Sequence, residues 1–134
     1  MAKVIGVGGV FFKSSNAKKL GAWYKKNLGV DVQDWGGASF QWEEKPASAH
    51  QRFTVWSPFP KDTKYFAPSR EPYMINFIVD DLDGVVKRLA KARIKIDLKG
   101  IEASEFGRFA WVVDPDGRKL ELWEPPLKAK KKKS

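Results

Sequence analysis

The sequence predicts an α+β domain built from two copies of one β-α-β-β-β unit. An apolar, β-branched stretch followed by a helical pattern and then by short strand candidates occurs twice along the chain. The stretch 58–72 between the two occurrences holds four prolines, which is typical of a linker because proline removes strand donors and disfavours helices. The 134 residues suffice for one hydrophobic core, so we expect a single domain over 1–127, with modules at about 4–57 and 73–125.

The first unit begins with a strand over Val7 to Phe12, which is rich in β-branched and aromatic residues. Ser14-Ser15-Asn16 then offers capping groups for a helix over Ala17 to Asn27, and Gly29 provides its stop. Four apolar residues recur at steps of three and four along this helix: Leu20, Trp23, Tyr24 and Leu28.

Three short strands are expected to complete this unit, over Val30 to Asp34, Ala38 to Glu43 and Arg52 to Trp56. They are separated by Gly36-Gly37 and by the polar segment 44–51, which are typical of turns and loops.

The second unit repeats this order. Tyr73 to Val79 is predicted to be a strand, and Asp80-Asp81 starts a helix with negative charge at its N-terminus, where it is favourable. The apolar stripe of this helix consists of Val85, Val86, Leu89 and Ala92. The remaining strands are predicted over Ile94 to Asp97, Ala110 to Val113 and Lys119 to Glu124, with Ile101 to Phe106 as a loop or a weak additional strand.

The two units align with each other, which indicates an internal duplication. Phe12 corresponds to Phe77 at an offset of 65 residues. Phe53 to Pro58 corresponds to Leu120 to Pro125 at an offset of 67, which aligns a Trp and a Pro at the ends of both final strands.

Composition excludes several kinds of site. The chain has no Cys, which excludes disulfides, thiolate nucleophiles and zinc–thiolate centres. The segment Ala2 to Gly6 is too short for the apolar part of a signal peptide, and no apolar run reaches the roughly 18 residues of a membrane span. We therefore expect a soluble, cytoplasmic protein with no membrane partner.

The formal net charge of +9 is concentrated at the C-terminus. Lys128 and Lys130 to Lys133 supply five of these charges and leave a mildly basic body of +4. We expect 128–134 to be a disordered, solubilising tail. Electrostatic attraction to nucleic acid is the alternative, but the chain has no base-reading motif, so a nucleic-acid partner is not expected.

A hairpin signal near the end of the chain carries a family resemblance. In Asp114-Pro115-Asp116-Gly117, proline presets one dihedral, aspartate can bond the backbone and glycine accepts positive φ. This turn stands between two strand candidates at the end of a duplicated chain, and Asn27-Leu28-Gly29-Val30 follows the first helix. With these motifs the chain resembles the glyoxalase/bleomycin-resistance/dioxygenase (vicinal oxygen chelate) superfamily over Gly8 to Pro125. The resemblance implies two modules whose sheets curl into half-barrels and together form a cup.

In the metal enzymes of that superfamily the ligands stand on the first and last strands of each module, and the resemblance places these positions on Gly9, Thr54, Met74 and Glu121. Only Glu121 is a usual ligand, because glycine has no side chain, a thioether is soft and a hydroxyl is neutral. The single His, His50, falls in a polar loop, where we expect it to be solvated. We therefore expect no metal and no other cofactor, with an oxygen-ligated divalent ion at Glu121 as the alternative.

Strand alternation predicts which side chains share the cup with Glu121. Lys119 and Trp123 lie on its face of the last strand. The candidate ligand-binding residues are Phe11, Lys13, Thr54, Trp56, Met74, Asn76, Arg108, Trp111 and Trp123. Such an aromatic cavity with few polar groups is typical of a small-molecule site. The alternative is that these aromatic residues form the core or pack against a partner subunit.

Two roles are open for Glu121. A carboxylate among Trp residues is a candidate catalytic base, and it could equally form an ion pair with Lys13, Lys119 or Arg108. Arg108 precedes a strand, where it either holds an anionic ligand or is solvated.

The leading hypothesis is a metal-independent, glyoxalase-like protein that binds an unknown small molecule, as the bleomycin-resistance branch does. Bleomycin itself is disfavoured, because it is cationic and the body of this chain carries +4. The rival hypothesis is a lyase, isomerase or dioxygenase-type enzyme that uses Glu121 as a base or as a metal ligand. The resemblance alone implies a homodimer.

Overall fold

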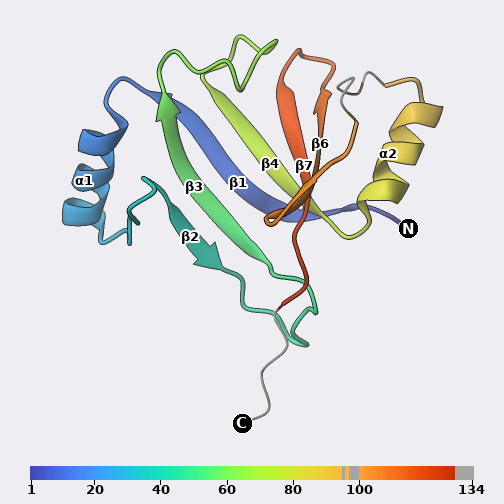
Figure 1. The fold of residues 1–134 in the computed structure, drawn as a ribbon, viewed down its shortest axis with the longest axis horizontal. Coiled ribbons are helices and arrows are strands. Elements are labelled where there is room, and N and C mark those ends of the chain that lie inside the picture. The colour runs from blue at the N-terminus through green and yellow to red at the C-terminus, as the bar shows by residue number, and fades with distance from the viewer. Residues whose placement is uncertain (95, 97–99, 129–134) are drawn as a thin grey trace.

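The computed structural model describes residues 1–94, 96 and 100–128, whose strands form one mixed sheet in the order β2-β3-β1-β4-β7-β6-β5. The first module consists of β1 (Val4–Ser14), α1 (Ala17–Leu28), β2 (Ala38–Gln41) and β3 (Phe53–Pro60). The second consists of β4 (Tyr73–Val79), α2 (Leu82–Lys91), β5 (Glu102–Ser104), β6 (Gly107–Val113) and β7 (Lys119–Glu124). The two helices lie at opposite sides of the molecule, with the strands between them (Figure 1).

The two modules join edge to edge through their first strands. β1 pairs with β4 in the antiparallel direction, with Val10 opposite Ile75 and Phe11 opposite Met74. In each module the last strand runs parallel to the first, β3 beside β1 and β7 beside β4. The predicted α+β fold of two related modules is therefore confirmed.

Both helices begin at the predicted capping residues. The side chain of Asn16 accepts a hydrogen bond from the Lys19 N–H at 3.0 Å, and Asp81 accepts one from Gly84 at 3.1 Å. Gly29 ends α1 in the left-handed conformation with φ of 69°, which costs glycine little. The sequence signals for the start of both helices and for the end of α1 are thus confirmed.

The prediction of a strand over Val30 to Asp34 is wrong. The Gln33 N–H donates to the Gly37 carbonyl at 2.8 Å, and the Gly36 N–H donates to the Gln33 carbonyl at 2.9 Å, so this segment closes a turn before β2. The strand predicted over Ile94 to Asp97 lies partly outside the described residues, and Ile96 forms an isolated bridge with Val112. The segment 101–106, predicted to be either a loop or a weak strand, contains the short strand β5.

β3 extends into the proline-rich stretch. β2 pairs with β3 only as far as Trp56, so the rest of β3 is an edge on that side. Proline is tolerated at such an edge because no neighbour needs its missing N–H. Pro58 and Pro60 accordingly stay in the strand, opposite Phe12 and Ser14 of β1.

The core has two clusters of buried residues. The larger one packs α2 against the sheet and consists of Val79, Leu82, Val85, Ala110, Val112 and Leu122. The other contains Met74, Trp111 and the fully buried Phe66, which comes from the linker between the modules. The linker is therefore part of the core and not only a connection.

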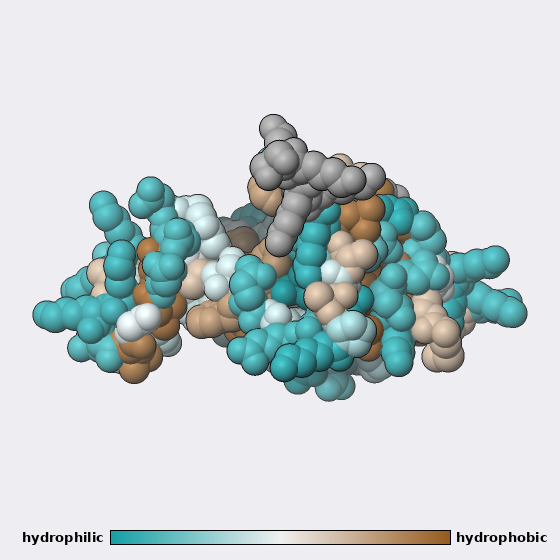
Figure 2. All heavy atoms as spheres, turned by 90° about the horizontal axis from the view of Figure 1, so that it is seen from below, coloured by the Kyte–Doolittle hydropathy of each residue, from teal (hydrophilic) through white to brown (hydrophobic). Residues whose placement is uncertain are grey.

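α1 packs less closely than α2. Its one fully buried residue is Gly21, whereas Trp23 and Leu28 are more than half exposed. Seen from below, polar residues cover most of the surface, and apolar residues show among them on the side of α1 (Figure 2). No helix in the described part of the chain is long and apolar enough to span a membrane.

Gly8 of β1 makes room for side chains from β4 and β7. The register of β1 against β4 shifts between Val7 and Gly9, which leaves Gly8 as the extra residue of a bulge. A Cβ atom on Gly8 would collide with the Asn76 side-chain oxygen and lie 2.9 Å from a ring atom of Trp123. This approach of two side chains to bare backbone requires glycine at position 8.

We expect Gly8→Ala to lower the free energy of unfolding by about 1–3 kcal/mol, as overpacking does, measured by urea denaturation. Gly21→Ala is the matched control, because its new Cβ would lie 3.3 Å from Val32 and helical Gly-to-Ala changes are favourable by up to about 1 kcal/mol. Equal stability of the Gly8→Ala variant and the parent would contradict the close packing at the bulge.

Candidate functional site

A cavity of about 740 Å³ lies on the face of the sheet that points away from the helices, and we call it the cup. Eight aromatic residues line it: Phe11, Trp35, Phe53, Phe59, Tyr65, Phe106, Phe109 and Trp123. The other lining residues are Ser39, Gln51, Val55, Asn76 and Glu121. Trp35 and Phe106 are more than half exposed, which puts them at the mouth.

The register of the last two strands arranges the aromatic wall. Phe109 of β6 pairs with Trp123 of β7, and their rings are nearly parallel with centroids 5.9 Å apart. Phe53 of β3 meets Trp123 edge-on at 5.1 Å, so the wall is continuous from the second module to the first. Such parallel-displaced and edge-on pairs are favourable ring geometries and give the wall a defined shape.

Glu121 is buried in the cup with its carboxylate held by donors from three segments. Asn76 of β4 donates to Oε1 at 2.6 Å, and the indole N–H of Trp111 donates to Oε2 at 2.8 Å. The hydroxyl of Tyr65, in the linker, donates to the same Oε2. A side chain with only 2% exposure has lost its water, and these charge-assisted hydrogen bonds replace it.

Tyr65 remains a hydroxyl donor over a wide pH range. Burial, together with the adjacent Glu121 charge and its hydrogen bond, raises the pKa of Tyr65 well above its ordinary value. Lys119 anchors the same residue, since its Nζ lies 2.8 Å from the Tyr65 carbonyl oxygen and over the Tyr65 ring. The linker is thus fastened to the lining of the cup beside Glu121.

One row of residues crosses the cup from strand to strand. Val55 lies opposite Gly9, Gly9 opposite Asn76, and Asn76 opposite Glu121. Trp111 continues the row on the other side of Glu121. The resemblance assigned the four metal-ligand positions of the family to Gly9, Thr54, Met74 and Glu121. In the structure, Val55 and Asn76 take the places in this row that were assigned to Thr54 and Met74.

Asn76 has an unused acceptor. Its amide nitrogen is committed to Glu121, while its Oδ1 is buried without a hydrogen-bond partner in the part of the chain that the structure describes. The residue is 1% exposed and lines the cup. An unpaired buried acceptor in a cavity wall is a feature that a ligand donor can satisfy.

The predicted cup residues Thr54 and Trp56 lie on the opposite face of β3. Trp56 packs against Tyr24 of α1 with ring centroids 4.7 Å apart. The Thr54 hydroxyl donates to the Val7 carbonyl and accepts from the Trp42 indole. The prediction aligned β3 to β7 one residue out of step, and since side chains alternate, that error reversed the face.

Arg108 also lies away from the cup. It pairs with Asp83 of α2 through two hydrogen bonds of 2.8 Å and lies 3.5 Å from Glu124. The hydrogen bond from Arg108 lowers the pKa of Asp83. Of the partners considered for Glu121, Arg108 is therefore not one in this structure, because Arg108 alternates with Phe109 and so faces α2. A role of Arg108 in holding an anionic ligand stays a prediction.

The other candidates are placed as follows. Phe11, Asn76 and Trp123 line the cavity, and Trp111 reaches it through Glu121. Met74 shares their face but is 1% exposed and covered by Phe66 and Trp111 in the core cluster. Lys13 lies near the end of β1, opposite Phe59, and does not line the cavity.

His50 is not the solvated residue that its loop suggested. Its Nδ1 lies 2.8 Å from the Pro125 carbonyl, and the residue forms an isolated bridge with Leu127. The Lys128 N–H donates to the Ala49 carbonyl at 2.8 Å, so the predicted tail 128–134 begins with a residue tied to this loop. The rest of that tail, 129–134, lies outside the described residues.

The donor set of the cup does not fit a transition-metal site. The row Gly9, Val55, Asn76 and Glu121 contains one carboxylate, and both of its oxygens already accept hydrogen bonds. No group of three or more His, Cys, Asp or Glu side chains that could hold a metal occurs among residues 1–94, 96 and 100–128. Iron, nickel and zinc sites normally draw on several such ligands.

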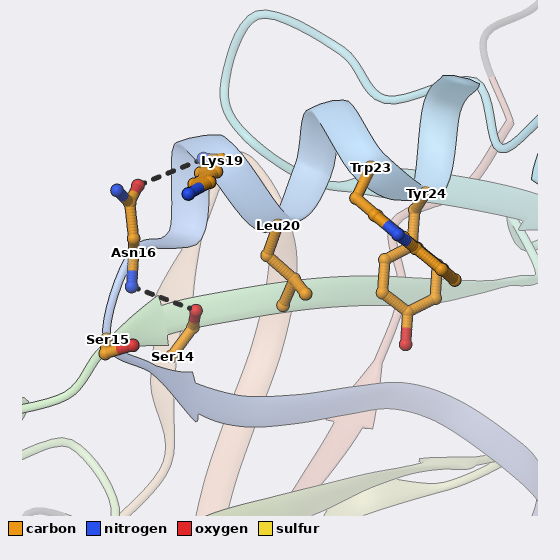
Figure 3. Close-up of a pocket in the computed structure, with 7 residues that line it drawn as sticks. All are labelled: Ser14, Ser15, Asn16, Lys19, Leu20, Trp23 and Tyr24. Atoms are coloured by element: carbon orange, nitrogen blue, oxygen red, sulfur yellow. Dashed lines mark hydrogen bonds between the residues drawn. The ribbon is translucent and has the colours of Figure 1, made fainter. Parts of the chain in front are cut away.

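A second pocket, of about 490 Å³, lies beside the first turns of α1 (Figure 3). At its polar end, Asn16 accepts from Lys19 and donates its own N–H to the Ser14 hydroxyl at 3.3 Å, so these groups cap the helix. Its apolar side is formed by Leu20, Trp23 and Tyr24. This pocket reflects the loose packing of α1 and contains no carboxylate.

Sequence reasoning missed several cup residues. Phe53 and Val55 would have been found with the correct register of β3, because they alternate with Thr54 and Trp56. Tyr65 carries no comparable signal, since it lies in a segment without strand or helix periodicity.

Comparisons with solved structures identify proteins of the same fold. The chain is similar to a methylmalonyl-CoA epimerase variant from Streptomyces coelicolor in complex with 2-nitronate-propionyl-CoA, with a TM-score of 0.64, 14% identity and coverage of 96% of this chain and 100% of the epimerase. A glyoxalase/bleomycin resistance protein/dioxygenase superfamily member from Vibrio splendidus 12B01 gives a TM-score of 0.55 and 13% identity, over 92% of this chain and 99% of that one.

A methylmalonyl-CoA epimerase from Mycobacterium tuberculosis gives a TM-score of 0.57 and 20% identity, over 92% of this chain and 89% of the other. No family model and no curated protein sequence matches the chain. At these identities the likeness concerns the fold, and the glyoxalase-like fold predicted from the sequence is confirmed.

The raised pKa of Tyr65 leads to a prediction about alkaline stability. Because the pKa is higher in the folded than in the unfolded chain, the contribution of Tyr65 is fully present below the unfolded value of about 10 and is lost as pH rises above it. We expect Tyr65→Phe to be less stable than the parent near neutral pH and to lose less stability between about pH 9 and 11, measured by urea denaturation. Tyr24→Phe, in α1, is the control and should follow the parent; a Tyr65→Phe curve parallel to the parent would contradict the assignment.

Proposed function

We propose that this chain binds a small, largely apolar molecule in the cup without using a metal. The observation that carries the proposal is the cavity of about 740 Å³ with eight aromatic side chains and a buried, hydrogen-bonded carboxylate at its floor. Apolar walls with a few placed polar groups are typical of small-molecule sites, and this volume suits a ligand of drug-like size.

The geometry supports binding more than catalysis by Glu121. A general base must be aligned with the proton that it removes, whereas the Glu121 carboxylate is held in place by hydrogen bonds from Tyr65 and Trp111 to Oε2 and from Asn76 to Oε1. An isomerase or lyase mechanism of the kind that the epimerase fold relatives suggest would require this network to rearrange.

The cup can be tested with a neutral aromatic probe. We expect naphthylmethanol to shift the indole N–H signals of Trp123 and Trp35 in two-dimensional NMR, because both line the cavity. A ligand of about twelve non-hydrogen atoms should bind with a Kd between micromolar and millimolar values. Val55→Trp should weaken binding at least about tenfold by filling the cup, while Trp56→Phe, on the opposite face of the same strand, should leave affinity unchanged.

Two results would count against this proposal. One is the absence of shifts at the cup with the probe at millimolar concentration. The other is a stoichiometric amount of nickel, zinc, iron or manganese in the purified protein by elemental analysis, which would establish a metal-dependent site.

We also propose that the chain forms a homodimer. Support comes from large apolar side chains that lie exposed on the first module, among them Trp23, Leu28 and Phe40. Sedimentation equilibrium should give twice the chain mass of 15.2 kDa at micromolar concentration. A mass of one chain over the whole accessible concentration range would contradict the dimer.

A further inference from the structure

The polar atoms that the floor of the cup leaves for a ligand are hydrogen-bond acceptors. The donors of Tyr65, Asn76 and Trp111 are all directed at Glu121, and the Trp123 indole N–H is bonded to the Phe106 carbonyl at 2.8 Å. In the described part of the chain Asn76 Oδ1 is buried without a partner. Oε1 of Glu121, which receives the Asn76 N–H, has lone-pair capacity for a second donor. A ligand that fits this floor must therefore supply donors.

The charge that the cavity presents is negative. Glu121 carries the one formal charge among the described residues that line it. Lys119 lies on the same face of β7, but its ammonium contacts the Tyr65 carbonyl and lies 5.8 Å from the centroid of the Trp111 ring, and it is not part of the lining. An anionic ligand would bring its charge against a desolvated carboxylate, which is unfavourable.

The walls attract cations as well. The faces of aromatic rings carry negative electrostatic potential, and cation–π attraction grows when the cation is removed from water. Here Phe53, Phe109 and Trp123 surround the space in front of Glu121 and Asn76. Aromatic walls around a carboxylate and an unpaired amide oxygen suit a positively charged donor.

We infer that the ligand of the cup is a protonated amine carried on an aromatic or other apolar body. The inference rests on the proposed function, since it names the class of small molecule that the same cavity takes. The ammonium donates to Glu121 Oε1, next to the uncompensated Asn76 Oδ1, and the apolar body lies against the Phe109 and Trp123 rings. The positive net charge of the chain would favour an anionic ligand. A ligand inside the cup, however, contacts the lining residues that the structure describes, whose one charge is that of Glu121, and not the basic surface.

Three probes with one body and different head groups test the inference: naphthylmethylamine, which is a cation at neutral pH, neutral naphthylmethanol and anionic naphthoate. We expect the amine to bind about ten- to a hundredfold more tightly than the alcohol, and naphthoate to bind most weakly. The Kd values are measured by NMR titration at the Trp123 indole signal, at low ionic strength.

Glu121→Gln should remove most of the amine preference and bring the amine close to the alcohol in affinity. Glu124→Gln is the matched control, because it removes the same charge from the same strand on the face where Glu124 contacts Leu82 and Arg108. It should leave the preference unchanged. If Glu121→Gln does not fold, the naphthylmethyl-trimethylammonium ion on the parent protein serves instead, and it should bind more tightly than naphthoate.

The outcomes separate the two proposals. If naphthoate binds as tightly as the amine or more tightly, or if Glu121→Gln retains the full amine preference, the inference is wrong while small-molecule binding stands. If none of the probes shifts cup signals, the proposed function itself fails.

Discussion

The buried carboxylate of Glu121 is the group on which the arrangement of the cup depends. Removing an ionised side chain from water is costly unless hydrogen bonds replace the lost hydration. Here three neutral donors do so, and each comes from a different segment: the linker, β4 and β6. The carboxylate thereby fixes the position of these segments relative to β7. The aromatic wall depends on the same contacts, because Phe109 lies on β6 and Trp123 on β7.

Much of the fold could be predicted from the sequence because its signals are local. The caps Asn16 and Asp81, the helix stop at Gly29 and the Asp114–Gly117 turn act through neighbouring backbone groups, and the structure contains all of them. The strand predicted over Val30 to Asp34 failed because tight backbone hydrogen bonds around Gly36 and Gly37 outweigh its alternating pattern.

The site could be predicted only in part, because it depends on register. The offset of 67 residues aligned Trp56 with Trp123, yet Trp56 packs on α1 and Trp123 lines the cup. A sequence alignment can pair the correct two strands and still be shifted by one residue. In a strand, such a shift assigns every side chain to the wrong face of the sheet. Tyr65 was beyond prediction, since nothing local indicates that a linker residue returns to bond a carboxylate 56 positions later.

The linker supplies side chains that belong to neither module. The two modules repeat one order of strands and helix, but Tyr65 and Phe66 lie in the stretch that connects them and belong to neither module. Two separate modules could pair through their first strands and build the sheet, but neither would contain the segment that brings Tyr65 to Glu121. The carboxylate network therefore needs the covalent connection between the modules, because a sheet assembled from two unlinked modules would lack the Tyr65 hydroxyl at Glu121.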